Sequence, residues 1–88
     1  MPSEQPFLSV AEAQRRIHDP EISHSADKVM AAFTLMEYCE RDLQITIHDM
    51  LRCLDYGGTI AEMGARCLYV RTGRRAWLEN RRTFLICS

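Results

Sequence analysis

The sequence predicts a mainly α-helical single domain of about four helices that ends in a C-terminal β-hairpin. A hydroxyl stands three residues before a carboxylate at Ser9–Glu12, Thr46–Asp49 and Thr59–Glu62, as in a helix capping box. Apolar residues after these signals recur at three- and four-residue steps, which is typical of amphipathic helices. The last fifteen residues change to aromatic and β-branched side chains around a polar tip, which favours a hairpin. An all-α bundle is the alternative, since this last segment also tolerates a helix.

The chain begins with residues 1–8, which contain two prolines and show no periodic pattern. We expect a flexible arm there, followed by one domain over 9–88. The first helix is predicted from Ser9 to about Ile17. It should stop before Asp19-Pro20, because the residue before a proline is disfavoured in a helix.

The second helix is predicted from a cap at Ser23 or Ser25 to about Arg41 or Asp42 and is the clearest amphipathic segment. Its spacing places Val29, Phe33, Met36 and Leu43 on the inner face. The residues 43–46 alternate and end in β-branched side chains, so they are predicted as a short strand or as plain extended chain.

Two short helices are predicted on either side of Tyr56-Gly57-Gly58, one starting at Thr46 and one at Thr59. Glycine supplies the left-handed backbone that closes a helix at little steric cost. The core-facing residues are expected to be Ile47, Met50, Leu51 and Leu54 in one helix and Ile60, Met63, Cys67 and Leu68 in the other. The short connection indicates a helix-turn-helix layout.

From Ala26 onward, the predicted order of elements resembles the winged helix-turn-helix arrangement. The resemblance covers about two thirds of the chain and lies in this order, not in a diagnostic residue string. It implies a recognition helix that begins at Thr59 and a wing formed by a hairpin at about 74–87.

Charge is unevenly distributed along the chain. Residues 1–55 hold five basic and ten acidic side chains, whereas residues 56–88 hold six arginines and two glutamates. This asymmetry indicates that the C-terminal third faces an anionic partner. Alternatively, the two parts attract each other within the fold or across a dimer.

The first functional hypothesis is a small regulator that binds DNA or RNA. Arginine suits phosphate contacts because its planar fork donates two parallel hydrogen bonds. Glu62 and a sequence pI of about 6.3 depart from the usual basic footprint. The residues predicted to contact nucleic acid are Thr59, Arg66, Arg71, Arg74, Arg75, Arg81 and Arg82.

The second hypothesis is a protein-binding inhibitor, anti-regulator or adaptor that acts as a monomer or a homodimer. The helix predicted over 25–42 is rich in methionine and aromatic residues, and methionine packs adaptably against partners. The interface residues predicted for this function are Met30, Leu35, Tyr38 and Trp77.

Neither a metal site nor catalysis is expected. Cys39, Cys53, Cys67 and His48 have suitable ligand chemistry, but the chain lacks the close Cys-x2-Cys pair of structural zinc sites. His48 and Cys53 are five residues apart on one helix and therefore face about 140° apart, which is unfavourable for a dyad. No glycine-rich phosphate loop is found, so we expect no cofactor and buried, reduced thiols.

The sequence also gives an expectation for location. No basic segment followed by an apolar run is found near Met1, so no signal peptide is predicted. The longest apolar run, Val29–Phe33, is far shorter than the ~20 residues that span a bilayer. A cytoplasmic protein that does not contact membranes is expected.

Overall fold

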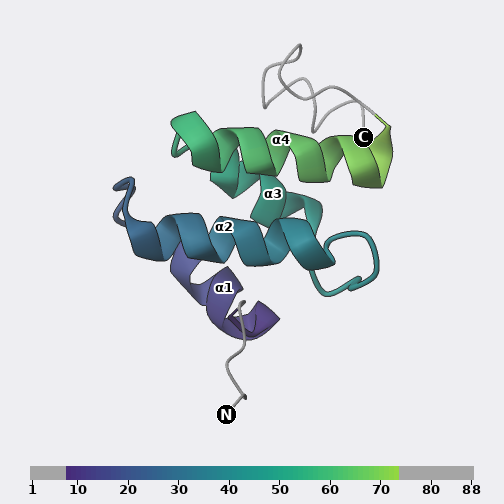
Figure 1. The fold of residues 1–88 in the computed structure, drawn as a ribbon, viewed down its shortest axis with the longest axis horizontal. Coiled ribbons are helices and arrows are strands. Elements are labelled where there is room, and N and C mark those ends of the chain that lie inside the picture. The colour runs from purple at the N-terminus through teal and green to yellow at the C-terminus, as the bar shows by residue number, and fades with distance from the viewer. Residues whose placement is uncertain (1–7, 74–88) are drawn as a thin grey trace.

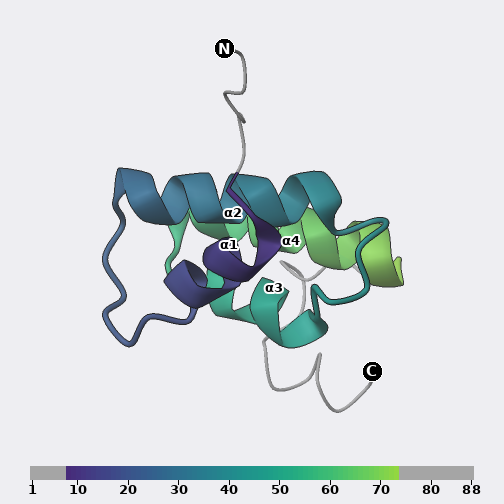
Figure 2. The same cartoon turned by 90° about the horizontal axis from the view of Figure 1, so that it is seen from below.

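The computed structural model describes residues 8–73, which form four helices: α1 (Val10–Ile17), α2 (Ala26–Tyr38), α3 (Ile47–Leu54) and α4 (Gly58–Thr72). The prediction of a mainly helical protein is confirmed. Helices α2 and α4 lie side by side and run in the same direction (Figure 1). Figure 2 shows α3 below these two helices, on the side that also carries α1. One face of the α2–α4 pair is therefore not covered by another described helix.

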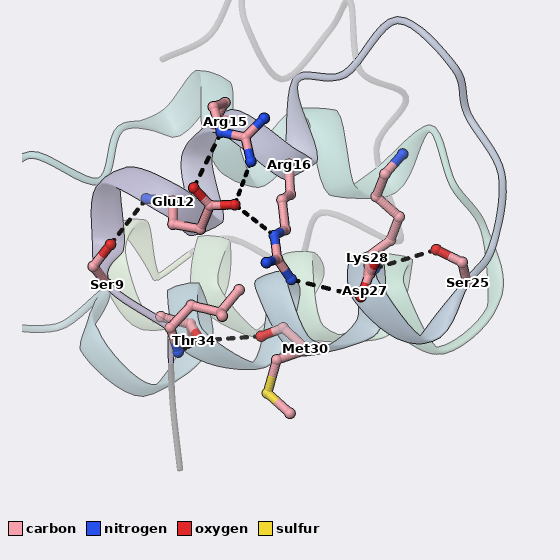
Figure 3. Close-up of polar contacts among 10 residues, drawn as sticks. Ser9, Glu12, Arg15, Arg16, Ser25, Asp27, Lys28, Met30 and Thr34 are labelled. Carbon is pink, nitrogen blue, oxygen red and sulfur yellow. Dashed lines mark hydrogen bonds and ion pairs between the residues drawn. The ribbon is translucent and has the colours of Figure 1, made fainter. Parts of the chain in front are cut away.

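Helix α1 begins as the sequence predicts. The Ser9 hydroxyl accepts a hydrogen bond from the Glu12 backbone amide at 3.1 Å (Figure 3). The Glu12 carboxylate does not complete the capping box. It binds Arg15 and Arg16 instead, and Arg16 Nη1 also lies 3.6 Å from Asp27 Oδ1 of α2. Glu12 thus lies in the first turn of α1 and holds Arg16, and Arg16 connects α1 to Asp27 of α2.

Helix α2 buries only part of the predicted face, with Val29 and Met36 half-buried against the core. Phe33 is 41% exposed and Leu43, in the following turn, is 79% exposed, whereas Ala31 and Leu35 are fully buried. The prediction used the largest apolar side chains, but small alanines lie inward where α1 and α4 both pack closely on α2. Leu35 therefore belongs to the core and is not an interface residue.

Helix α2 ends at Tyr38, earlier than predicted, and residues 39–46 form turns instead of a strand. Arg71 of α4 explains the early end. Its Nε donates to the Cys39 carbonyl at 2.9 Å and its Nη2 to the Asp42 carbonyl at 3.3 Å. These bonds supply partners for carbonyls that a continuing helix would have satisfied itself.

Helices α3 and α4 meet at the predicted glycine corner. Thr46 and Asp49 form a complete capping box at the start of α3. The box predicted at Thr59 is wrong: Gly57 is the N-cap of α4, and it makes no side-chain cap bond. Gly57 and Gly58 have φ angles of +73° and +55°, so the chain turns within two residues and the helix starts before Thr59.

The packing of α3 on α4 depends on Gly64. A Cβ atom at this position would lie 2.6 Å from Cys53 Cβ and 2.7 Å from the Met50 carbonyl oxygen. The helices therefore approach more closely than any side chain at position 64 allows. The predicted core residues Met50, Leu51, Ile60 and Leu68 are fully buried around this crossing.

Polar side chains hold the segment between α1 and α2 in place. Buried Lys28 donates to the Glu21 carbonyl at 2.8 Å and to the Tyr56 hydroxyl at 3.1 Å. The Tyr56 hydroxyl in turn donates to the Ile17 carbonyl at 2.9 Å. Tyr56 of the glycine corner thus joins the end of α1 directly, and Lys28 ties α2 to the same contact.

Two predicted segments lie mostly outside the described residues. The hairpin at about 74–87 lies entirely outside them, and no strand occurs in residues 8–73. Of the predicted arm at residues 1–8, only Leu8 is described. It is half-buried, and its amide donates to Thr34 Oγ1 at 3.1 Å.

Candidate protein-binding groove

A groove of about 490 Å³ runs between the C-terminal parts of α2 and α4. The two helices that form its walls lie side by side in Figure 1. Cys39 and Cys67 are buried and lie in its floor, while Met36 and Val70 contribute apolar walls. The groove is lined by Met36, Glu37, Cys39, Glu40, Arg41, Arg66, Cys67 and Val70.

Burial raises the pKa of two thiols of the described core, Cys53 and Cys67. Burial raises the pKa of the Cys53 thiol to about 12, and the Asp49 carboxylate adds to this effect. Burial, followed by the neighbouring Cys39 thiol, also raises the pKa of Cys67. These thiols therefore stay protonated at neutral pH and pack as small apolar groups.

The rim of the groove carries charges of both signs. Glu37 and Arg41 face each other one helical turn apart, with Arg41 Nη2 and Glu37 Oε2 separated by 3.9 Å. The Arg41 guanidinium also lies over the Tyr38 ring, 5.1 Å from its centroid. Glu40 and Arg66 are exposed, and neither has a partner among the described residues.

Apolar side chains extend this surface along α2. Met30 and Phe33 are each 41% exposed, and Val70 on α4 is 44% exposed. Phe33 lies one turn before Met36, so it continues the α2 wall of the groove away from the charged rim. Large apolar side chains exposed next to a groove are typical of a protein-binding surface.

The residues predicted to bind nucleic acid do not form one site in the described structure. Thr59 and Arg66 are exposed at the start and middle of α4, but Arg71 is half-buried and occupied by the carbonyls that end α2. The other four, Arg74, Arg75, Arg81 and Arg82, lie outside the described residues.

The residues predicted for protein binding are only partly at the surface. Met30 is exposed as predicted, Tyr38 is half-buried beneath Arg41, and Leu35 is in the core. Trp77 lies outside the described residues. Sequence reasoning missed Val70 and Glu40; the spacing of Arg66 and Val70, one helical turn apart on α4, was the signal that could have indicated a shared face.

A second polar cluster lies between α1 and α3. His18 Nε2 is 2.7 Å from Asp49 Oδ1, while Gln14 Nε2 and the Thr46 amide both donate to Asp49 Oδ2 at 2.9 Å. These contacts hold the two helix ends together. Among residues 8–73, no buried side-chain nitrogen or oxygen lacks a hydrogen-bond partner. We therefore regard this cluster as structural.

Comparison of the chain with models of protein families, with curated proteins and with solved structures finds no match. Within the described part of the chain, none of the helices has the length and apolar character required to cross a bilayer. The same residues contain no group of three histidine, cysteine or acidic side chains arranged to hold a metal ion.

Proposed function

We propose that this protein is a non-enzymatic protein-binding module, a small adaptor or inhibitor, whose α2–α4 groove receives an amphipathic helix from a partner. The observation that carries this proposal is the exposure of Val70 in a groove with an apolar floor, together with exposed Met30 and Phe33 on the preceding turns of α2. Burying these side chains against a partner would remove apolar area from water, which is the main favourable term in association.

The shape of the groove favours a helix over an extended peptide. Its walls are α4 and the end of α2 with the turn that follows, and the two helices run in the same direction. Residues 8–73 contain no strand whose edge could pair with a peptide. An amphipathic helix places apolar anchors at positions i, i+3 or i+4, and i+7, which lie along one line. Met30 and Met36 of this protein could pack against the apolar anchors of the partner helix, because the flexible methionine side chain adapts to irregular surfaces.

Binding to selected helical peptides tests this proposal. A displayed library of peptides with apolar residues at i, i+4 and i+7 is panned against the full chain, and recovered peptides are titrated by fluorescence anisotropy. Val70→Asp should weaken binding by at least about tenfold, because it places a charge in the apolar wall. Tyr69→Asp is the matched control, since Tyr69 is exposed on the same helix but does not line the groove.

Two results count against the groove as a binding site. If no helical peptide is recovered from the library, the proposal that the groove binds an amphipathic helix is wrong. Equal loss of affinity in the Val70→Asp and Tyr69→Asp variants places the binding surface elsewhere. The helix content of each variant is compared by circular dichroism, so that unfolding is not mistaken for lost contact.

Nucleic-acid binding is the second candidate function. It is favoured by the compact α3–α4 corner and by four arginines against one glutamate in residues 74–88. Residues 8–73, however, carry seven basic and ten acidic side chains, so the described helices give little support to a phosphate contact. Titration with random duplex DNA at two salt concentrations tests this function. Replacing Arg74, Arg75, Arg81 and Arg82 by alanine should flatten the salt dependence if they contact phosphates.

A further inference from the structure

We infer that the free protein forms a two-fold symmetric homodimer in which the α2–α4 groove of each subunit faces the groove of the other. This inference concerns the regulation of the groove and rests on the proposed function, because a partner helix would have to displace the second copy. Most soluble homodimers have such a two-fold axis, which pairs each residue i with j of the partner and each j with i.

The distribution of unpaired charges is self-complementary under this symmetry. Glu40 follows the end of α2, whereas Arg66 lies on α4, so the groove has an anion on one wall and a cation on the other, neither of them paired within residues 8–73. A two-fold axis that runs along the mouth of the groove, parallel to both helices, places α2 of each copy opposite α4 of the other. Glu40 of each copy then faces the other copy's Arg66, and two ion pairs form at the same time.

The two charges also lie at nearly the same level along this axis. Cys39 and Cys67 are neighbours in the groove floor. Glu40 follows the first of them and Arg66 precedes the second, so at a rise of ~1.5 Å per residue the two charged residues are offset by only about 3 Å. Glutamate and arginine side chains are long enough to span this offset.

The apolar walls match under the same operation. Met36 lies about one turn before the level of the two thiols, and Val70 lies about one turn after it. Residues that line the groove are close to the axis, so Met36 of one copy approaches Met36 of the other, and the two Val70 side chains likewise approach each other. Apolar contacts therefore flank the ion pairs at both ends.

Charge reversal provides a decisive test by sedimentation equilibrium of the full chain between about 1 and about 200 µM. The wild type should show a monomer–dimer equilibrium. Glu40→Arg or Arg66→Glu alone should weaken dimerisation by at least about tenfold, because each creates two like-charge contacts. Glu62→Arg makes the same charge change on an exposed site of α4 that does not line the groove, and it should leave the dimer intact.

Mixing the two single variants gives the strongest test. In a mixed dimer, the new arginine of the Glu40→Arg variant would face the new glutamate of the Arg66→Glu variant, and the wild-type pair would form on the second side. Association should therefore return in the mixture, and also in the double variant Glu40→Arg/Arg66→Glu. A wild type that is monomeric up to about 200 µM overturns the inference. So does a dimer that is insensitive to both reversals, or a mixture that stays monomeric.

The outcomes separate this inference from the proposed function. If the wild type is monomeric but still binds helical peptides through Val70, the dimer inference is wrong and the proposed function stands. If a charge-sensitive dimer forms but no helical peptide binds, the dimer inference stands and the proposed function is wrong. If both hold, the selected peptide should shift the equilibrium toward the monomer, because the two compete for the same groove.

Discussion

Replacing Gly64 by alanine should destabilise the protein, although alanine is the better helix former. At an open helical position, alanine is favoured over glycine by about 1 kcal/mol. At position 64, the added Cβ would meet Cys53 Cβ at 2.6 Å and the Met50 carbonyl oxygen at 2.7 Å. Ordinary van der Waals contact begins at 3.4 Å, so α3 and α4 would have to move apart.

The magnitude follows from the balance of these two effects. Overpacking a well-packed core costs about 1–3 kcal/mol, and the upper part of this range applies because a backbone carbonyl cannot rotate away. Subtracting the helix-propensity gain leaves a loss of about 1–2 kcal/mol in the free energy of unfolding. For a domain of this size, the midpoint of thermal unfolding should fall by roughly 5–15 °C.

Thermal unfolding followed by circular dichroism measures this effect, and an exposed site on α4 calibrates the propensity term. Comparing Glu62→Ala with Glu62→Gly gives the alanine-over-glycine preference in the same helix without a close neighbour. If Gly64→Ala unfolds at the same temperature as the wild type or higher, the close approach of α3 and α4 is not as described, and the reasoning fails.

Three further predictions concern the polar contacts and the thiols. Asp49→Ala should lower the free energy of unfolding, measured with urea, by about 2–3 kcal/mol, because the capping box is lost and Gln14 and His18 lose their shared hydrogen-bond acceptor. The control Asp42→Ala removes one exposed hydrogen bond and should cost less than about 1 kcal/mol. The bonds from Arg15 and Arg16 lower the pKa of Glu12 from 4.5 to about 2. Its stabilising effect should be complete above pH 4.5 and disappear as the pH falls toward 2, so the stability difference between wild type and Glu12→Gln should vanish at the acidic end; a constant difference would contradict this. Finally, with its pKa raised to about 12, the Cys53 thiol should react with a disulfide reagent at about pH 8 far more slowly in folded than in urea-unfolded protein; rapid labelling of Cys53 in native protein, located by peptide mapping, would argue against its burial.

Helix boundaries near a side-chain cap were predictable because the signal is local. Ser9 and Thr46 cap α1 and α3 as predicted, since a hydroxyl that binds an amide two or three residues on needs no distant partner. At Thr59 the same pattern was misleading. The positive φ angles of Gly57 and Gly58 let α4 begin before the threonine, and this depends on the path of the whole corner.

The buried face of α2 was less predictable because its period fits more than one set of apolar residues. Val29 and Met36 are half-buried as predicted, but Phe33 and Leu43 are exposed, and Ala31 and Leu35 are fully buried where α1 and α4 pack on α2. The candidate groove was missed for a different reason. Its lining comes from the end of α2 with the turn that follows and from α4, which α3 separates in the chain, and only the parallel arrangement of the two helices brings Met36 and Val70 to one surface.

The sequence by itself determined the helical class, the four helices of residues 8–73, the caps of α1 and α3, the cap of α2 to within Ser23 or Ser25, and the glycine corner, because hydrophobic spacing and capping act within a few residues. The tertiary structure decided which face of α2 is buried, where α2 ends and why Gly64 carries no side chain. Those features arise from close contacts between separate helices. Such contacts follow from shape and distance, which a one-dimensional pattern does not contain.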